Sequence, residues 1–497
     1  MPEGRPLRIL HVAGEVYPFL KTGGLADVVG ALPDALHTLG FDVRVLMPGY
    51  GAALERARNE GPLDVVAHWH DGRLLASTLP RGCPIWFYET EAFTERWGNP
   101  YDNPAGYPWA DNADRFDELA RVGAALADDA MGVGWRPDVV HAHDWHTGML
   151  PVHLQLARVP AASVFTIHNL AHQGLFELPA RERLGLPGWV EHWQALEFQG
   201  LLSFMKGGIG FSDKVTTVSH TYAREIRTPA SGEGLDGLLA WRGADLVGIA
   251  NGIDTDTWDP ATDPTLPATY TADAPEGKAA ARQALLQETG LRAGARTPIL
   301  AFVGRLAAQK GIDVLVDAID DLIALPAAVV LLGSGDPAVR TRLEAAAKRH
   351  PSKVHATFAF DEPYAHRLYA GADMLVMPSR FEPCGLSQLN AMRYGTIPVV
   401  QRTGGLIETV TDFTETGLAD GRATGFQFDG ISTTALVAAV RRARSQFLRQ
   451  ARWRQLVGNA MRRDVSWTRS ARAYAALYEE ARDVRRRRFP YHTRHRR

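Results

Sequence analysis

One short loop combines glycine with a cation and a hydroxyl in the way that phosphate-binding loops do. The segment Lys21-Thr22-Gly23-Gly24-Leu25 follows an apolar run and precedes a stretch with helical spacing. Free backbone N–H groups at a helix start favour an anion, and glycine lets the backbone approach it closely. We therefore predict a phosphate or sugar-hydroxyl contact at this loop, although Lys21 taken alone could be an ordinary surface lysine.

A second loop resembles the first. Residues 402–410 read Arg-Thr-Gly-Gly-Leu-Ile-Glu-Thr-Val, and residues 21–29 read Lys-Thr-Gly-Gly-Leu-Ala-Asp-Val-Val. Coincidence is one interpretation, because Gly-Gly turns are common after strands. The other is that two similar loops on two similar domains hold one ligand in the cleft between the domains, outside the carboxyl ends of the strands.

Two further cations follow a strand-like run in the C-terminal half. Arg305 and Lys310 lie in the loop after the apolar residues Ile299–Val303. A guanidinium offers phosphate oxygens a planar fork and an ammonium acts as a point charge. The pair could therefore stabilise a departing nucleotide diphosphate without a metal. The alternative is that both are exposed loop cations.

A carboxylate sits in an unusual place after the run Met374–Met377. Glu382 is flanked by aromatic, proline, cysteine and glycine residues, and Gly385 precedes a helical stretch. Glu382 could accept hydrogen bonds from sugar hydroxyls or balance positive charge on a reacting sugar. It could also cap the helix that follows, and both interpretations stay open.

Histidines cluster in the N-terminal half, in His141-Ala142-His143-Asp144-Trp145-His146. Adjacent strand residues point to opposite faces and the rest are expected in a turn, so no metal site is predicted there. Asp144 and His168 each end a strand and are expected to contact sugar hydroxyls. Aromatic residues are dense between Trp97 and Trp109, which suits either sugar stacking or a packed loop.

These side chains need strands that end at one edge of a sheet. Short apolar runs alternate with helical stretches, which indicates parallel strands buried on both faces. The expected strands are Leu7–Ala13, Val43–Met47, Val139–His143, Ser163–Ile167, Lys214–Val218, Leu246–Ala250, Ile299–Val303, Ala328–Leu332, Val354–Phe360, Met374–Met377 and Ile397–Val400. The expected helices include Leu25–Leu39, Ile312–Ala324, Pro337–Arg349 and His366–Ala370.

The predicted fold is α/β, with two doubly wound domains. A segment rich in Asp, Thr and Pro, residues 251–276, separates the two sets of strands. We predict an N-terminal domain over residues 1–255, a C-terminal domain over 256–470, and a final helix with a basic tail over 471–497.

Composition excludes several classes of protein. The chain has 497 residues, 45% hydrophobic and 22% charged, with a net charge of −2. No overall field favours nucleic acid or a membrane surface. Two distant cysteines and no export-like segment indicate a cytoplasmic protein. The arginines at 485–488, 494, 496 and 497 are interpreted as a solvated, poorly ordered end, with an anionic partner as the alternative.

Taken together, the motifs resemble the ADP-glucose-dependent glycogen and starch synthases over nearly the whole chain. The motifs, in order, are Lys21-Thr22-Gly23-Gly24-Leu25-Ala26-Asp27-Val28, His141-Ala142-His143-Asp144-Trp145-His146, Phe165-Thr166-Ile167-His168-Asn169-Leu170, Asn251-Gly252-Ile253-Asp254-Thr255, Ser379-Arg380-Phe381-Glu382-Pro383-Cys384-Gly385-Leu386 and Arg402-Thr403-Gly404-Gly405-Leu406. Each is weak alone, but six in this order are highly specific.

The resemblance implies the GT-B glycosyltransferase architecture, in which two Rossmann-like domains face a deep cleft. The C-terminal domain would hold the nucleotide and the N-terminal domain the acceptor, with a final helix near Ala471–Val484 crossing back to the first domain. The implied reaction moves glucose from ADP-glucose to the non-reducing end of an α-1,4-glucan such as glycogen, with retention of configuration. No metal or other cofactor, nucleic-acid partner or membrane partner is expected.

The resemblance also implies roles for single residues. The implied catalytic residues are Glu382, Arg305, Lys310, His168 and Asp144. The implied ADP-glucose contacts are Lys21, Thr22, Gly23, Gly24, Arg305, Lys310, Phe360, Cys384, Gly385, Leu386, Thr403, Gly404 and Gly405. Tyr101 would help to hold the acceptor.

Two positions depart from wider relatives. Related retaining transferases often carry a second glutamate where this chain has Asn390, and glycogen and starch synthases also lack it. Phe360 stands where a tyrosine that stacks on adenine is usual, which weakens the case for adenine.

The alternative functions are a transferase with a lipid or small acceptor, a glucan phosphorylase and a non-catalytic glucan-binding scaffold. The first would lack the Lys21 loop, the second needs a pyridoxal phosphate lysine and a longer chain, and the third would not need the cations and Glu382.

Overall fold

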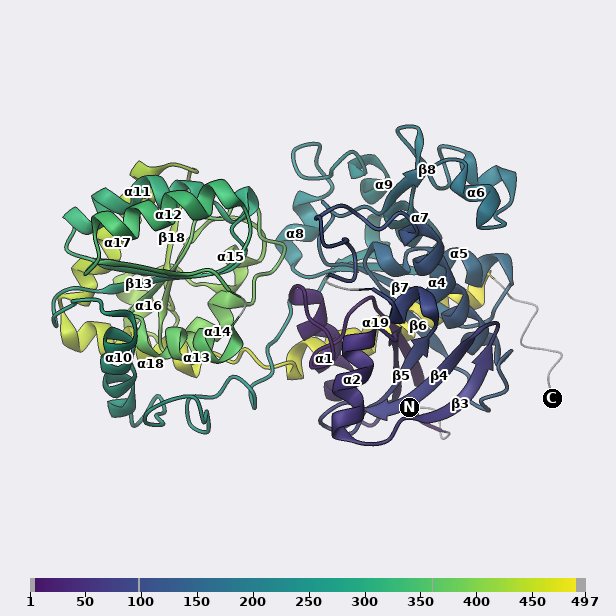
Figure 1. Ribbon diagram of the computed structural model, residues 1–497, viewed down its shortest axis with the longest axis horizontal. Coiled ribbons are helices and arrows are strands. Elements are labelled where there is room, and N and C mark those ends of the chain that lie inside the picture. Colours follow the sequence, from purple (N-terminus) through teal and green to yellow (C-terminus); the bar gives the residue numbers. More distant parts are fainter. Residues whose placement is uncertain (1–4, 97–98, 360, 489–497) are drawn as a thin grey trace. The chain divides into compact units, whose positions relative to one another are not determined.

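The computed structural model describes residues 5–96, 99–359 and 361–488 (Figure 1). The chain divides into two compact units: unit 1 is Met1–Asn251 with Trp467–Arg497, and unit 2 is Gly252–Ser466. The sequence placed the corresponding boundaries after residues 255 and 470.

Unit 1 is built on a nine-stranded sheet in the order β12-β11-β7-β6-β1-β2-β5-β4-β3. Its strands are β1 (Arg8–Val12), β2 (Asp42–Pro48), β3 (Asp64–Trp69), β4 (Gly72–Thr78), β5 (Pro84–Glu89), β6 (Val139–His143), β7 (Ala162–Ile167), β11 (Lys214–Thr217) and β12 (Leu246–Gly248). The strands from β12 to β5 are parallel, while β3 and β4 form an antiparallel hairpin at one edge. A smaller antiparallel sheet has the order β8-β10-β9, from β8 (Leu175–Glu177), β9 (Glu197–Phe198) and β10 (Leu201–Ser203).

Helices pack on both faces of the large sheet. The helices of unit 1 are α1 (Gly24–Thr38), α2 (Gly51–Glu60), α3 (Glu91–Thr94), α4 (Asn112–Asp128), α5 (Met149–Leu156), α6 (Ala180–Arg183), α7 (Phe204–Phe211), α8 (His220–Glu225), α9 (Asp236–Trp241) and α19 (Thr468–Arg488). Helices α1 and α19 contact each other, and α19 contacts β6 and β7. Helices α4 and α5 contact each other and the strands β1, β2 and β7.

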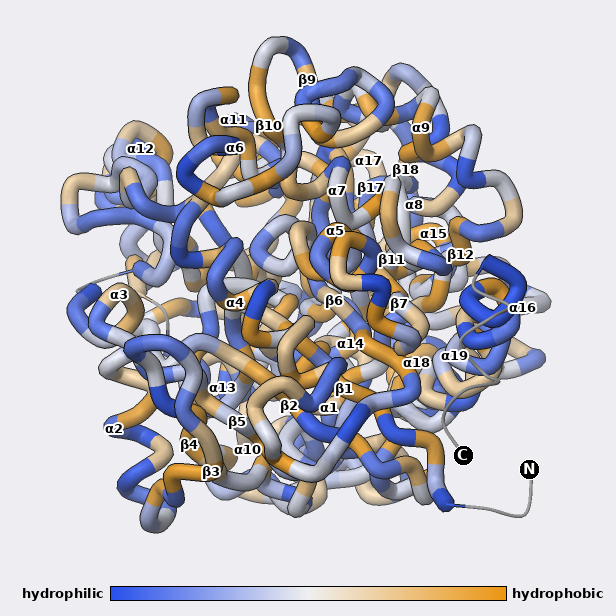
Figure 2. Tube along the Cα trace, turned by 90° about the vertical axis from the view of Figure 1, so that its right-hand side faces the viewer, coloured by the Kyte–Doolittle hydropathy of each residue, from blue (hydrophilic) through white to orange (hydrophobic). Residues whose placement is uncertain are grey.

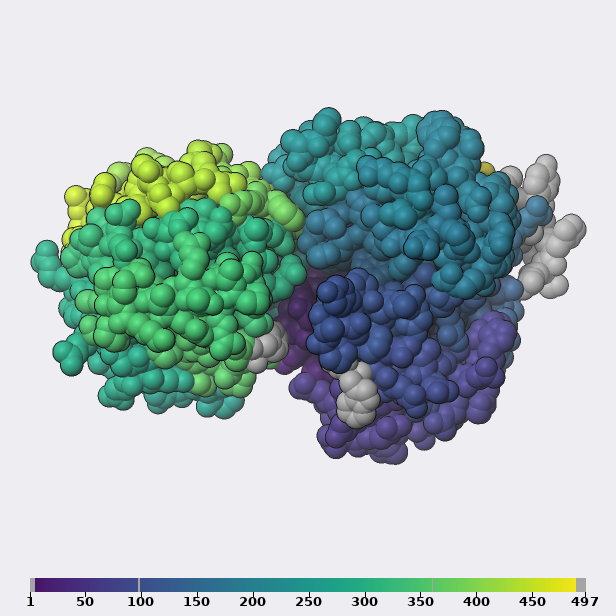
Figure 3. Space-filling view, turned by 45° about the horizontal axis from the view of Figure 1, so that its top comes forward, coloured from purple at the N-terminus to yellow at the C-terminus, as the bar shows by residue number. Residues whose placement is uncertain are grey.

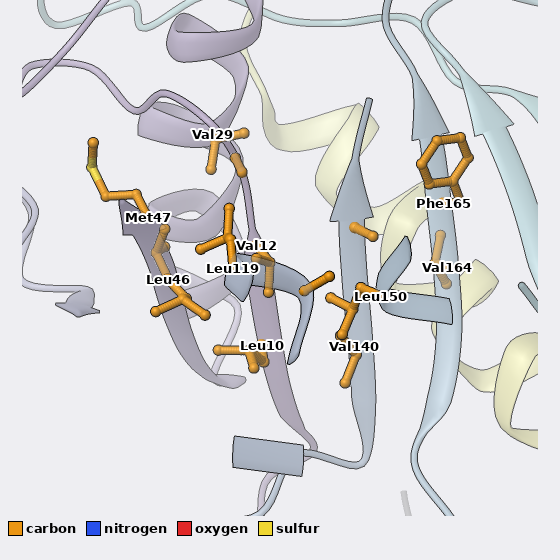
Figure 4. Close-up of a cluster of buried hydrophobic side chains, with 14 of the residues drawn as sticks. Leu10, Val12, Val29, Leu46, Met47, Leu119, Val140, Leu150, Val164 and Phe165 are labelled. Atoms are coloured by element: carbon orange, nitrogen blue, oxygen red, sulfur yellow. The ribbon is translucent and has the colours of Figure 1, made fainter. Parts of the chain in front are cut away.

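The core of unit 1 lies between the sheet and these helices. Leu10 and Val12 on β1 and Val140 on β6 are fully buried, as are Leu119 and Leu150 on α4 and α5. Figure 4 shows these side chains gathered in one cluster, and Figure 2 shows hydrophobic residues running through the central strands. Strands buried on both faces account for the continuous apolar runs in the sequence.

Unit 2 contains a six-stranded parallel sheet in the order β15-β14-β13-β16-β17-β18. Its strands are β13 (Ile299–Val303), β14 (Ala328–Leu332), β15 (Val354–Thr357), β16 (Met374–Met377), β17 (Ile397–Gln401) and β18 (Phe426–Phe428). Counted along the chain, this order is 3-2-1-4-5-6, which is the order of a Rossmann fold.

Helices cover both faces of this sheet too, as Figure 1 shows. They are α10 (Glu276–Thr289), α11 (Ile312–Ala324), α12 (Pro337–Arg349), α13 (Glu362–Gly371), α14 (Ser387–Arg393), α15 (Gly404–Thr409), α16 (Glu415–Ala419), α17 (Thr433–Phe447) and α18 (Gln450–Arg462). Helices α11, α12 and α17 lie on one face, and α10, α13, α14 and α18 lie on the other. In Figure 3 the yellow-green residues near 440 lie at the surface of unit 2 beside green residues of its earlier part. The predicted fold class, two doubly wound α/β domains, is confirmed.

The C-terminal arginines correct one expectation. Helix α19 extends to Arg488, so residues 485–488 are not a poorly ordered end. Arg485 is buried and donates to the carbonyl of Val159, and Arg488 lies 3.2 Å from the Asp213 carboxylate. The arginines at 494, 496 and 497 lie outside the described residues. Among the helices of the described ranges, none is long and apolar enough to cross a membrane.

Candidate active site

Three loops of unit 2 meet at the carboxyl edge of its sheet. They follow β13, β16 and β17, and β13 and β16 are the neighbours at which the strand order reverses. Ligands of such sheets bind outside the strand ends at this reversal point. The first loop carries Arg305 and Lys310, the second carries Glu382, and the third carries Thr403.

The first two loops are joined by an ion pair. The Lys310 Nζ atom lies 2.8 and 2.7 Å from the two carboxylate oxygens of Glu382. The Ser379 hydroxyl, 3.1 Å from Glu382, also donates to it. Glu382 is 4% exposed, so a solvated carboxylate is excluded. Helix α14 begins after Leu386 without a side-chain cap, and the interpretation of Glu382 as its cap is therefore wrong.

Glycines let the loops approach each other. A Cβ atom on Gly311 would lie 1.9 Å from the Pro378 carbonyl oxygen, and one on Gly405 would lie 2.5 Å from Cys384 Cα. The Gly405 N–H donates to the Glu382 carbonyl over 3.0 Å. Only glycine fits such contacts, which explains why both loops need it.

The remaining predicted residues of unit 2 lie around this centre. Arg305 is exposed and donates to Gln309 over 3.1 Å. Gly385 has a φ of +75° and precedes Leu386, and Thr403 lies at the start of α15, next to Gly404. The adenine-stacking expectation fell on Phe360, which lies outside the described residues.

Unit 1 repeats this arrangement at the carboxyl edge of its own sheet. Its strand order reverses between β1 and β6, and the loops after β1, β6 and β7 carry Glu15, Asp144 and His168. The Thr22 hydroxyl and N–H both donate to one Glu15 oxygen, the hydroxyl over 2.7 Å. Lys21 pairs with Asp27 over 2.7 Å, and α1 begins at Gly24 after Gly23.

Glu15 was not predicted from the sequence. It follows the first strand and is 3% exposed, with the Thr22 loop folded over it. Burial raises its pKa to about 7, against the lowering effect of the Thr22 hydrogen bonds. A carboxylate placed directly after a strand end, beside a Gly-Gly loop, is the signal that could have found it.

Asp144 fixes the start of the loop that bears His168. Its carboxylate accepts the His168 N–H over 3.1 Å, and burial raises its pKa to about 8. Asp144 itself has a φ of +58°, an uncommon conformation for a residue other than glycine. Asp144 and the backbone of His168 are therefore in direct contact within unit 1.

Tyr101 is tied to the same edge of the sheet. Its ring stacks on His146 with centroids 4.4 Å apart, and the Glu15 carboxylate adds to the effect of burial in raising its pKa. Tyr107 is 69% exposed and does not join this packing. Trp97 lies outside the described residues.

The expectation that strand alternation would separate the histidines is wrong. His141 and His143 are two residues apart on β6 and so share one face, and His11 on β1 pairs with His141 in register. One ring nitrogen from each of these three residues lies within 4.8 Å of the other two. Although this spacing is open to a metal ion, all six nitrogens already take part in hydrogen bonds.

Two Rossmann-like units with these loops are the architecture of a glycosyltransferase that uses a nucleotide sugar. Residues 8–241 match the family model described as "Starch synthase catalytic domain", and residues 289–455 match "Glycosyl transferases group 1". The chain is 48% identical to glycogen synthase 1 of Methylococcus capsulatus, over 96% of this chain and 97% of that relative. It is 47% identical to the glycogen synthase of Thioalkalivibrio sulfidiphilus, over 95% and 99%.

A solved structure agrees with these relatives. The catalytic domain of starch synthase IV from Arabidopsis thaliana, bound to ADP and acarbose, superposes with a TM-score of 0.85 at 31% identity. The match covers 96% of this chain and all of that one. The chain belongs to the glycogen synthase family and is an enzyme, a retaining glucosyltransferase.

Proposed function

We propose that this enzyme transfers glucose from ADP-glucose to the non-reducing end of an α-1,4-glucan and so elongates glycogen. The observation that carries the proposal is the Lys310–Glu382 pair at the reversal point of the unit 2 sheet, 2.7 Å apart and flanked by glycine loops. It supplies a cation for a diphosphate and a carboxylate for sugar hydroxyls at the edge where such sheets bind nucleotides. The starch synthase relative bound to ADP and acarbose supports the same donor and acceptor chemistry.

In the proposed donor site, the cations of unit 2 stabilise the departing diphosphate. Arg305 binds its oxygens through the guanidinium fork, and Lys310 adds a point charge. Glu382 holds glucose hydroxyls, while the backbone of Cys384, Gly385 and Leu386 contacts the sugar. The glycine loop from Thr403 to Gly405 cradles phosphate. We assign adenine stacking to Phe360 on the resemblance alone.

Unit 1 contributes further groups in this proposal. The loop from Lys21 to Gly24 contacts the ADP-glucose, His168 lies beside the anomeric carbon, and Asp144 binds the sugar or acceptor. Tyr101 holds the acceptor glucan. None of these roles requires a metal or another cofactor.

Retention of configuration is compatible with attack on the face that the diphosphate leaves. The acceptor 4-hydroxyl bonds to the anomeric carbon as the bond to the diphosphate oxygen breaks, and a phosphate oxygen takes the hydroxyl proton. The protein then contributes positioning and charge stabilisation.

One assay tests the donor and the acceptor together. The enzyme is incubated with glycogen and either ADP-glucose or UDP-glucose, and nucleotide release and chain lengthening are measured. We expect ADP release matched by lengthening. A clear preference for UDP-glucose, or nucleotide release without lengthening, would contradict the proposal.

Two variants test the leaving-group role. We expect Arg305→Ala and Lys310→Ala to lower kcat by about 100-fold or more, because each removes charge stabilisation that matters most in the transition state. Arg349→Ala, which removes an exposed arginine of α12 paired with Asp320, is the matched control and should keep its activity. Normal turnover by both Arg305→Ala and Lys310→Ala would refute this role.

A further inference from the structure

Six side chains of unit 1 form one unbroken line of hydrogen bonds that ends on His168. We call this line the histidine chain; its members are His168, His143, His11, Tyr478, His141 and Thr166. The links are His168 Nε2 to His143 Nδ1 (3.0 Å), His143 Nε2 to His11 Nδ1 (3.0 Å), His11 Nε2 to Tyr478 Oη (3.3 Å), Tyr478 Oη to His141 Nδ1 (2.9 Å) and His141 Nε2 to Thr166 Oγ1 (2.6 Å).

The sheet and the last helix bring these residues together. His11 and His141 lie side by side on β1 and β6, and His143 follows two residues later on the same face. Helix α19 packs over this part of the sheet and inserts the Tyr478 hydroxyl between His11 and His141. All members except His168 are fully buried, so no water competes for these bonds.

The histidines of the chain are neutral, which limits how protons can be arranged. Burial lowers the pKa of His11 and His168 to about 3 and lowers the pKa of His141 and His143 well below the ordinary value. A neutral imidazole has one N–H and one accepting nitrogen. The buried Tyr478 hydroxyl has no acceptor among the described residues other than His11 and His141, so it must donate to one of them. With one proton in each link, two arrangements then remain: all protons point toward His168 or all point toward Thr166.

The Thr166 end distinguishes the two arrangements. If the protons point toward Thr166, its hydroxyl accepts from His141 and its own proton needs another acceptor. Within the described ranges, this hydroxyl has no hydrogen-bond partner other than His141, and Thr166 is fully buried. A buried donor without an acceptor is costly and rare. If Thr166 instead donates to His141, every proton in the chain has an acceptor.

We infer that the histidine chain holds His168 as a single tautomer, with Nε2 accepting from His143 and the proton on Nδ1. Within the described part of the chain, Nδ1 of His168 makes no hydrogen bond, and the residue is partly exposed. It therefore presents a neutral N–H donor to an oxygen of a bound ligand, such as a sugar hydroxyl or phosphate oxygen. That this ligand is the donor substrate rests on the proposed function; the tautomer does not.

The other five members of the chain are positioning residues in this account. His143 contacts His168 directly, whereas His11, Tyr478, His141 and Thr166 act through it. The last helix of the chain thereby takes part in orienting a residue that follows β7, more than 300 positions earlier in the sequence.

The tautomer can be measured without substrate. The full-length enzyme labelled with ¹⁵N-histidine is examined by long-range ¹H–¹⁵N correlation, with His168→Gln used to assign the signals. We expect His168 to show a protonated Nδ1 and a bare Nε2 at pH 7. A protonated Nε2, or a doubly protonated ring, would overturn the inference.

Two nearly isosteric variants at His143 provide the kinetic test. His143→Asn keeps an amide N–H near the position of Nδ1, whereas His143→Leu has a similar shape and no donor. We expect the leucine variant to lose at least about tenfold more kcat than the asparagine variant, with a smaller effect on KM, because misorientation of a positioned group costs rate. Equal losses would mean that His143 only fills space, and would overturn the positioning role. If either variant fails to fold, the tautomer of the unmodified enzyme decides.

His168→Ala separates this inference from the proposed function. Unimpaired turnover by His168→Ala would remove His168 from the proposed active site, whatever the tautomer is. The tautomer measurement and the His168→Ala assay can therefore fail independently.

Discussion

The Lys310 ammonium and the Glu382 carboxylate neutralise each other in this structure. Glu382 is 4% exposed, so it depends on Lys310 and Ser379 for the hydrogen bonds that replace water. A diphosphate that attracted Lys310 would leave Glu382 to accept from sugar hydroxyls instead. Binding of the proposed donor would then be an exchange of partners, which costs less than the creation of two bare charges.

The Glu15 carboxyl predicts a measurable dependence of stability on pH. Its folded pKa of about 7 lies above the ordinary glutamate value of 4.5, so its contribution to stability is fully present below pH 4.5 and is lost as pH rises through 7. The Glu15→Gln variant has no carboxyl to titrate, so it does not lose this contribution to stability as pH rises. We expect its free energy of unfolding, relative to the wild type, to rise by about 2–3 kcal/mol between pH 5 and pH 8.

Urea unfolding at several pH values measures this difference. Glu55→Gln in α2 is the control, because Glu55 is exposed in the same unit. A pH-independent difference between Glu15→Gln and the wild type would contradict the raised pKa.

At the scale of elements, α19 completes the core of unit 1. Ala471, Tyr474, Leu477, Tyr478 and Ala481 are buried on the face that packs against the sheet and α1. We expect Leu477→Ala to destabilise unit 1 by about 2–5 kcal/mol, because it removes a buried side chain and leaves a cavity.

Peptide-resolved hydrogen exchange measures this effect unit by unit. Glu479→Ala, on the exposed side of α19, is the control and should change stability by about 0.5 kcal/mol or less. Loss of protection confined to unit 2, or none at all, would show that α19 does not support the unit 1 core.

Local patterns in the sequence were enough for most of the elements. The strands at 139–143, 299–303, 328–332 and 374–377 and the helices at 312–324 and 337–349 have the bounds predicted for them. The β3–β4 hairpin was missed because β3 is an exposed edge strand whose residues lack a continuous apolar run. The small sheet of β8, β9 and β10 was missed because its strands are only two or three residues long.

The candidate site was predictable only in part. Motifs placed Arg305, Lys310 and Glu382 in loops that follow strands of the same sheet, but they did not predict the direct pairing of Lys310 with Glu382. The histidine chain depends on the register between β1 and β6 and on the docking of α19, and no local pattern encodes either. Contacts between segments that are distant in the sequence can be identified only when the fold is known.

At the scale of the whole molecule, unit 1 contains buried groups whose pKa shifts oppose each other. Histidines 11, 141, 143, 146 and 168 have lowered pKa values, so their contribution to stability is present above about pH 6.5 and is lost as pH falls. Glu15 and Asp144 have raised pKa values, and their contribution is lost as pH rises through about 7 and 8.

We therefore expect unit 1 to be most stable near about pH 7, and to lose stability as pH falls from 6 to 5. The histidines dominate on the acid side because five of them outnumber the four carboxyls of unit 1 whose pKa is raised, Glu15, Asp34, Asp144 and Asp213. Hydrogen exchange corrected for the intrinsic rate, with unit 2 peptides as the internal reference, checks this. Equal protection of unit 1 at pH 5 and pH 7 would contradict it.

The return of α19 to unit 1 has a consequence for biosynthesis. During synthesis, residues 252–466 emerge from the ribosome before Trp467–Arg497. Unit 2 can therefore finish folding while unit 1 still lacks its last helix. At ordinary translation rates, these roughly 200 residues take about 10–40 s to synthesise. During that interval water can reach the face of β6 and β7 that α19 will later cover. The imidazoles of His11 and His141 do not yet have the Tyr478 hydroxyl as a hydrogen-bond partner. A chain that stopped before Trp467 would leave this face uncovered.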